Sequence, residues 1–252
     1  YGLYIGSNKL SSVGNIANYI YIFFINIFFL KKNIYYENYK NIDINIYFIN
    51  LDKSKDRYES IKKQIKSLDI KNCQRFAGVD GSTYKLTSIE NGYFKNCGFN
   101  HNINKGTTGC ALSHYNLWNL ILDKQIKECI VLEDDIIFNN NFNNQLNLLL
   151  RKKKNYDLIF LYNTIKHSKK NYKNNKIIPY KKLKWYGCGA VGYYINSRAT
   201  KYLVDFINKN GFNREVDWVM YEQLHNINIC ILKYPIIKLL DVKSVISENN
   251  IG

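Results

Sequence analysis

Three adjacent carboxylates follow a short, purely apolar run, and this junction constrains the fold more than any other feature of the sequence. The run covers residues 129–132, and the carboxylates are Glu133, Asp134 and Asp135. An uninterrupted apolar run of this length is typical of a strand buried on both faces of a sheet. In open α/β sheets, ligands bind at the carboxyl ends of the strands. The junction therefore predicts an α/β fold with a ligand site beside the three acids.

Strand-like and helix-like segments alternate on both sides of this junction. Apolar, β-branched runs predict strands at residues 44–51, 129–132, 157–161, 190–195 and 227–233. Apolar residues at helical spacing predict helices at residues 52–69, 111–123, 142–150, from an N-cap at Ser197 to about residue 207, and 217–226. This alternation is typical of a Rossmann-type, mostly parallel sheet with helices on both faces. We therefore predict a single α/β domain over residues 42–252, with an unperiodic, mobile surface loop at residues 163–175.

Residues 1–41 are predicted to be an N-terminal extension. They contain an apolar run at residues 13–30 that is long enough to cross a bilayer, although three asparagines interrupt it. A membrane anchor and an apolar extension outside a membrane both fit this run. More lysines follow the run than precede it, so an anchor would leave the domain facing the cytosol. We expect a cytoplasmic or cytosol-facing, membrane-associated protein, with the endoplasmic reticulum lumen as the alternative.

The charge balance does not indicate nucleic-acid binding. The chain carries 36 Lys and Arg against 20 Asp and Glu, a net charge of +16. Most of the surplus is lysine in a background rich in Asn, Ile and Tyr, while nucleic-acid readers depend on arginine for bidentate contacts. No groove-binding motif is present. We interpret the lysines as a solvated surface and expect no nucleic-acid partner.

Six cysteines are scattered along the chain without a C-x-x-C pair or a regular spacing. Their distribution excludes a zinc ribbon and gives no disulfide framework. We predict buried thiols that behave as small apolar side chains. The six are Cys73, Cys97, Cys110, Cys129, Cys188 and Cys230.

The three acids after the apolar run are suited to a divalent cation. Adjacent carboxylates repel one another, and a bound cation removes that repulsion. On an extended backbone, Glu133 and Asp135 would point to one side and Asp134 to the other. Such a cation can bridge two phosphates and stabilise a departing nucleoside diphosphate. A solvated acidic turn explains the same three residues equally well.

Several sequence blocks, in chain order, resemble glycosyltransferase family 25. This family includes bacterial lipooligosaccharide galactosyltransferases and procollagen hydroxylysine galactosyltransferases. The resemblance covers about residues 44–247, and GCALSH followed by EDD is its specific part. The matching blocks are IYFINLDKSKDR (46–57), RFAGVDG (75–81), GTTGCALSHYNLW (106–118) with IVLEDD (130–135), and GCGAVGYYINSRATKYL (187–203) with VDW (216–218).

The resemblance implies a GT-A-like fold, a UDP-sugar donor, Mn²⁺ or Mg²⁺ as the cation, and inversion at the anomeric carbon. It places the cation on Asp135, with Glu133 and Asp134 beside it. An inverting transfer needs a carboxylate base, for which Asp217 is the first candidate and Glu215 the second. The residues expected on the donor side are Asn50, Asp52, Arg57, Asp80, Ser113, His114, Gly187 and Gly189.

Several of these residues also have an ordinary structural role open to them, which the sequence does not decide. Arg57 would be a surface residue in a first helical turn, and Asp80 would satisfy the backbone of its own turn. His114 would be a packed, hydrogen-bonded histidine, and the two glycines would serve turn geometry. Asp217 would be the N-cap of its helix.

The resemblance does not fix the sugar or the acceptor. Galactose is expected first and glucose second, and the acceptor is a hydroxyl of a glycan, a lipid-linked saccharide or hydroxylysine. A catalytically silent family member that acts as a binding or scaffold subunit is the alternative to an enzyme. The intact acidic cluster favours the enzyme.

Overall fold

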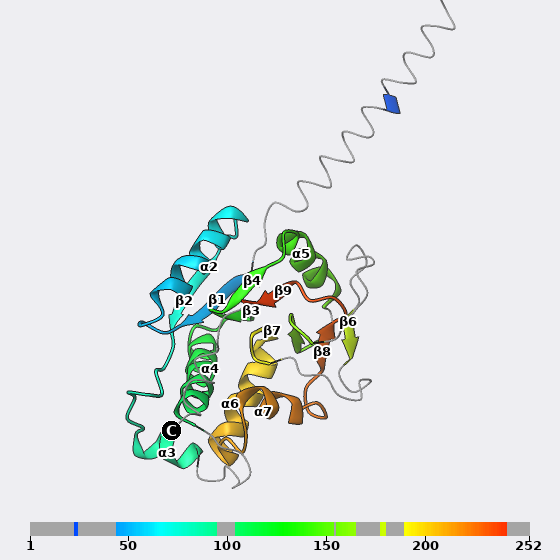
Figure 1. Ribbon diagram of the computed structural model, residues 1–252. Coiled ribbons are helices and arrows are strands. Elements are labelled where there is room, and N and C mark those ends of the chain that lie inside the picture. The colour runs from blue at the N-terminus through cyan, green and yellow to red at the C-terminus, as the bar shows by residue number, and fades with distance from the viewer. Residues whose placement is uncertain are drawn as a thin grey trace, which may run out of the picture. The chain divides into compact units, whose positions relative to one another are not determined.

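The structure is a computed structural model, and the helices and strands given below belong to the unit formed by residues 42–252 (Figure 1). It describes residues 23–24, 44–94, 104–153, 155–164, 177–179 and 189–240. No helix in these ranges is long and apolar enough to cross a membrane. Apart from Phe23 and Phe24, the apolar run at residues 13–30 lies outside the described residues, and so does most of the predicted loop at 163–175. Membrane association therefore stays a prediction.

Seven strands form one mixed sheet in the order β2-β1-β3-β7-β5-β8-β6. Five of them run in the same direction, whereas β7 and β6 run antiparallel to their neighbours. The strands are β1 (Asn45–Asn50), β2 (Cys73–Ala77), β3 (Glu128–Glu133), β5 (Leu158–Phe160), β6 (Ile177–Pro179), β7 (Gly192–Asn196) and β8 (Ile229–Leu232). A separate antiparallel pair joins β4 (Ile136–Phe138) to β9 (Ile237–Leu239).

Helices cover both faces of the sheet, as Figure 1 shows. In β3, Cys129 and Val131 pack with one group of helices, while Ile130 and Leu132 pack with another. The first group is α4 (Lys105–Asp123), α6 (Ser197–Asn210) and α7 (Val216–Glu222), and the second is α2 (Lys55–Ser67) and α5 (Phe142–Lys152). A short helix, α3 (Ser88–Tyr93), precedes α4. The predicted α/β class, with a mostly parallel sheet between two helical layers, is confirmed.

Several helix boundaries differ from the prediction, and three of them have a clear cause. The helix α4 begins six residues before the predicted 111, because the Asn104 side chain caps it by accepting a hydrogen bond from the Thr107 N–H at 2.8 Å. Asn196, rather than Ser197, caps α6, and it accepts from the Ala199 N–H. The helix α7 ends at Glu222 because its last turns tighten into i→i+3 hydrogen bonds.

The sequence did not predict β2, and its position matters for the site. β2 pairs in parallel with β1, so β1, α2 and β2 form a βαβ unit. The turn after β2 packs against the start of α4, where two glycines allow the backbones to meet. A Cβ on Gly81 would lie 1.7 Å from the Lys105 carbonyl oxygen, and one on Gly109 would lie 2.6 Å from the Gly81 nitrogen. This close approach brings Asp80 next to α4.

Candidate active site

A pocket of about 260 Å³ opens at the carboxyl ends of the three neighbouring strands β2, β1 and β3. Its walls are the start of α2, the turn after β2, the first half of α4 and the three acids that follow β3. Glu133, Asp134 and Asp135 all line it. The structure therefore places the predicted acidic cluster at a ligand-sized pocket, rather than on a solvated turn.

Asp134 is held by partners on both of its carboxylate oxygens. The Asn50 amide donates to Oδ2 at 2.7 Å, and Arg57 donates to Oδ1 at 3.1 Å. Arg75 in turn donates to the Asn50 side-chain oxygen at 2.8 Å. Burial raises the pKa of Asp134, while the hydrogen bonds from Asn50 and Arg57 oppose that rise. Asn50 therefore supports the acidic cluster from behind, and it is not among the residues that line the pocket.

Asp135 is the least satisfied of the three acids. Its Oδ2 lies 3.7 Å from an Arg57 nitrogen, and its Oδ1 is buried without a hydrogen-bond partner among the described residues. Burial, followed by the negative charge of Glu133, raises the pKa of Asp135 to about 7. A buried oxygen of this kind costs free energy unless a donor or a cation reaches it.

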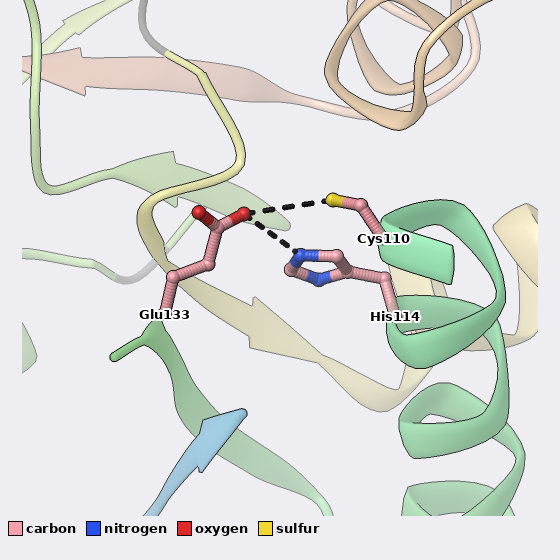
Figure 2. A group of neighbouring side chains, drawn as sticks. All are labelled: Cys110, His114 and Glu133. Carbon is pink, nitrogen blue, oxygen red and sulfur yellow. Dashed lines mark hydrogen bonds and ion pairs between the residues drawn. The ribbon is translucent and has the colours of Figure 1, made fainter. Parts of the chain in front are cut away.

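The predicted alternation of the three side chains does not continue past the end of β3. The strand ends at Glu133, so the residues that follow are no longer constrained to opposite faces. Arg57 lies within ion-pair distance of both Asp134 and Asp135. Glu133 points instead toward α4, where His114 and Cys110 contact it (Figure 2).

A buried hydrogen-bond chain leads to Glu133 from the protein interior. The Trp118 indole donates to the Tyr193 hydroxyl at 2.9 Å, and Tyr193 lies 2.8 Å from His114 Nδ1. His114 Nε2 lies 3.3 Å from Glu133 Oε1, and Cys110 Sγ lies 3.7 Å from the same oxygen. Because a carboxylate can only accept, the His114 Nε2–H donates to Glu133, and Tyr193, whose hydroxyl accepts from Trp118, keeps its own proton to donate to Nδ1. Burial raises the pKa of the Cys110 thiol well above its usual value, so this thiol keeps its proton.

Ser113 ties the turn after β2 to α4. Its hydroxyl donates to the Gly109 carbonyl at 2.6 Å and accepts from the Val79 N–H at 2.8 Å. Ser113 therefore has a structural role, in addition to the role predicted for it on the donor side of the site. The same turn presents Asp80, which forms an ion pair with Lys53 at 2.6 Å, and the hydrogen bond from Lys53 lowers the pKa of Asp80.

Asp52, Gly187 and Gly189 were also predicted on the donor side of the site. Asp52 is exposed, pairs with Arg75 and does not line the pocket. Gly189 has a φ of +59°, and the segment after it approaches the site, because the Val191 carbonyl accepts the Glu133 N–H at 2.8 Å. Gly187 lies outside the described residues.

The two predicted bases lie at the start of α7. Burial raises the pKa of Asp217, and the negative charges of Glu215 and Glu133 add to the effect. The charge of Asp217 also acts on Cys110, so Asp217 lies on the side of the acidic cluster, although neither base lines the pocket. The N-cap role for Asp217 is wrong, because Glu215 occupies that position.

The part of the chain that forms the site matches a known protein family. Residues 43–220 match the model described as "Glycosyltransferase family 25 (LPS biosynthesis protein)". The chain belongs to glycosyltransferase family 25. The matched range contains the pocket, the acidic cluster and both predicted bases, so family 25 membership rests on the part of the chain that forms the site.

Curated relatives of this family 25 chain come from distant sources. "Putative glycosyltransferase R655" of Acanthamoeba polyphaga mimivirus is 30% identical over 172 residues, which are 65% of this chain and 53% of that protein. "Procollagen galactosyltransferase 1" of Danio rerio is 30% identical over 126 residues, 46% of this chain and 21% of that protein. "Inactive glycosyltransferase 25 family member 3" of Mus musculus is 37% identical over 65 residues, 24% of this chain and 11% of that protein. The chain thus spans about half, or less, of the length of the relatives it matches.

Sequence reasoning missed Cys110 and Tyr193 as site residues. Cys110 carried a signal, because it precedes His114 by four residues and so lies on the same helical face. Tyr193 carried none, since its contact with His114 joins α4 to β7, two elements far apart in the sequence.

Proposed function

We propose that this family 25 chain transfers a hexose, galactose first and glucose second, from a UDP-sugar to an acceptor hydroxyl with inversion. The observation that carries the proposal is the buried, unpartnered Oδ1 of Asp135 in a pocket lined by two further carboxylates. A divalent cation and a diphosphate together match that pocket, because its carboxylates face cationic side chains from α2 and the segment before it.

The carboxylate set fits Mn²⁺ or Mg²⁺, which prefer hard oxygen ligands. Asp135 would be the principal ligand, with Glu133 beside it. Asp134 would orient the site, because Asn50 and Arg57 already occupy both of its oxygens. When bound, the cation would supply Lewis-acid stabilisation of the nucleoside diphosphate that leaves.

The cationic side chains suit the diphosphate of the donor. Arg57 lines the pocket and offers a planar fork that matches phosphate oxygens. Lys53 also lines it and would place a second positive charge at the other wall. Asp80, held by Lys53 and Ser82, is available to accept from a ribose hydroxyl.

Asp217 is the proposed base, with Glu215 as the second candidate. An inverting transfer requires a carboxylate that takes the proton from the attacking hydroxyl. The raised pKa of Asp217 makes it a stronger base than an exposed aspartate. Its Oδ1 accepts the Trp218 N–H at 2.9 Å, which fixes the carboxylate at the start of α7.

The acceptor is proposed to be a hydroxyl of a glycan, a lipid-linked saccharide or hydroxylysine. The matched family description refers to LPS biosynthesis, and one relative is named a procollagen galactosyltransferase. These names support a saccharide or hydroxylysine acceptor without choosing between them.

UDP release by the purified chain tests the proposal. A panel of UDP-sugars is assayed with Mn²⁺, with Mg²⁺ and with EDTA, in the presence of glycan and hydroxylysine-peptide acceptors. We expect turnover with one hexose donor, loss of turnover in EDTA, and loss in Asp217→Asn with the fold intact. No release from any donor would favour a catalytically silent family member that acts as a binding or scaffold subunit, and one relative is named inactive.

A further inference from the structure

Three side chains that line the pocket bring three different ligand atoms together, and Figure 2 shows how they point toward one another. They are the Cys110 Sγ, a ring nitrogen of His114 and a carboxylate oxygen of Glu133, and all lie within 4.8 Å of one another. Cys110 and His114 are one helical turn apart on α4, and Glu133 ends the neighbouring strand β3. The spacing of the two helical ligands is the one that places side chains on a single face.

We propose that Cys110, His114 and Glu133 form a binding site for a thiophilic divalent cation, for which Zn²⁺ is the natural probe. One sulfur, one nitrogen and one oxygen ligand suit a borderline-soft cation, whereas Mn²⁺ and Mg²⁺ favour oxygen alone. The proposed site shares Glu133 with the carboxylate set at Asp135, but its sulfur and nitrogen ligands give it a different metal preference. Its existence does not depend on the proposed glycosyl transfer.

The distances suit a single ion. Glu133 Oε1 lies 3.3 Å from His114 Nε2 and 3.7 Å from Cys110 Sγ. Ligands bound about 2.0–2.3 Å from a tetrahedral Zn²⁺ are separated by roughly 3.3–3.8 Å. The two separations from Glu133 therefore fall in the range that one tetrahedral ion requires, and Cys110 Sγ and the His114 ring nitrogen lie within 4.8 Å of each other. A bound ion would replace the proton that Cys110 shares with Glu133.

Tyr193 can orient the His114 ring both without and with a bound cation. Metal-bound histidines usually donate their second ring N–H to a neighbouring oxygen, and this contact orients the ring. Tyr193 lies 2.8 Å from His114 Nδ1 and can fill that role, because a phenol both donates and accepts. His114 itself is buried, so its ring has little freedom to leave the cluster. All three ligands line the pocket, which leaves a fourth coordination position open toward it.

Cation binding by the full chain, without any sugar nucleotide, tests the proposal. After treatment with EDTA, the chain is titrated with Zn²⁺ against a chromophoric chelator in excess Mn²⁺. Co²⁺ is then substituted to look for a thiolate-to-cobalt charge-transfer band. We expect one equivalent of Zn²⁺ that excess Mn²⁺ does not displace, and a cobalt band that disappears in Cys110→Ser. A catalytically silent chain would give the same result, so failure of the proposed transfer is distinguishable.

Matched variants separate this site from binding at another thiol or at the Asp135 carboxylate. Cys73→Ser changes a cysteine outside the pocket, and Asp135→Asn changes an acid outside the cluster, so both should keep the band. Tyr193→Phe keeps every ligand and should weaken Zn²⁺ binding by about 10–100-fold. Thermal unfolding shows whether each variant is folded. Absence of stoichiometric Zn²⁺ binding, or a band unchanged in folded Cys110→Ser, overturns the proposal.

Discussion

Two aspartates with buried carboxylate oxygens lie at opposite ends of the same sheet and have opposite surroundings. Asp157 immediately precedes β5, and it accepts hydrogen bonds from Arg198 at 2.9 Å, the Asn228 N–H at 2.8 Å and the Asn196 amide at 3.0 Å. Asp135 follows β3, and its Oδ1 has no hydrogen-bond partner among the described residues. One carboxylate is thus fully satisfied by the protein, and the other is not.

The comparison of Asp157 with Asp135 distinguishes two reasons why a protein buries carboxylate oxygens. Around Asp157, the donors come from two other chain segments, residues 196–198 and Asn228, and they tie the ends of β5, β7 and β8 together. Asp135 instead lines a pocket, and no donor from the described residues reaches its Oδ1. A satisfied buried acid stabilises the fold, whereas an unsatisfied one lowers stability and is retained for a ligand.

Asp135→Asn should produce the largest effect, and the effect should be on activity. Loss of the principal cation ligand should lower kcat/KM with the preferred UDP-sugar by about 10²–10³-fold, because stabilisation of the leaving diphosphate is lost. The free energy of unfolding should stay the same or rise, since the variant removes a partly buried carboxylate whose Oδ1 has no partner among the described residues. Steady-state kinetics and urea unfolding measure the two quantities.

Asp56→Asn is the matched control, because Asp56 is an exposed acid on α2. It should leave both kinetics and stability unchanged. A strong loss of stability in Asp135→Asn, without loss of turnover, would assign Asp135 to the same structural class as Asp157.

Asp157→Ala should show the reverse pattern. Its removal leaves several donors without an acceptor, among them the backbone N–H of Asn228. The free energy of unfolding should fall by about 3 kcal/mol. KM for the donor in the fraction that remains folded should not change, since Asp157 lies at the other end of the sheet from the pocket. A change in donor KM larger than the change in stability would contradict the comparison.

Much of the fold could be predicted because its signals are local. The apolar run before Glu133 and the helical spacing after Ser197 each depend on a few consecutive residues, and both elements formed near the predicted positions. β2 was missed because its burial is partial and its pattern CQRFA mixes polar with apolar residues. Its strand character comes from pairing with β1, which sequence spacing does not reveal.

The candidate site was predicted in outline but not in its connections. Glu133, Asp134 and Asp135 were identified as a cluster, and the pocket lies beside them. That Asn50 faces Asp134 rather than the pocket depends on a contact across 84 residues of sequence. The contact between Tyr193 and His114 joins two elements that meet only in the folded sheet. Motif positions therefore indicate where a residue lies, and tertiary contacts decide what it binds.

The stability of the metal-free chain should depend on pH through Asp135. Its pKa is raised from 3.8 to about 7 in the folded chain, so the folded state holds this proton more tightly than the unfolded state does. The free energy of unfolding should therefore fall as the pH rises from about 4 to about 7 and then level off. Urea unfolding in EDTA measures this slope.

The same experiment with Asp135→Asn isolates the residue. The variant has no titrating group at this position, so the difference between the two pH profiles should contain the whole effect of Asp135. Saturating Mn²⁺ should flatten the profile of the unsubstituted chain, because a bound cation favours the ionised carboxylate. Identical pH profiles for the unsubstituted chain and the variant would show that the pKa of Asp135 is not raised in the folded state.

Ser113→Ala sharpens the comparison, because Ser113 lines the pocket and yet is fully satisfied. Its hydroxyl bonds both Val79 and Gly109, so by the rule drawn from Asp157 it should behave as a structural residue despite its place in the site. The free energy of unfolding should fall by about 1 kcal/mol, since the Val79 N–H loses its acceptor. Because the turn that carries Asp80 then loses one anchor, donor KM should rise modestly while kcat stays near its original value. A large fall in kcat with unchanged stability would contradict this comparison. It would show that a polar group in the pocket can act in catalysis although the protein satisfies its hydrogen bonds.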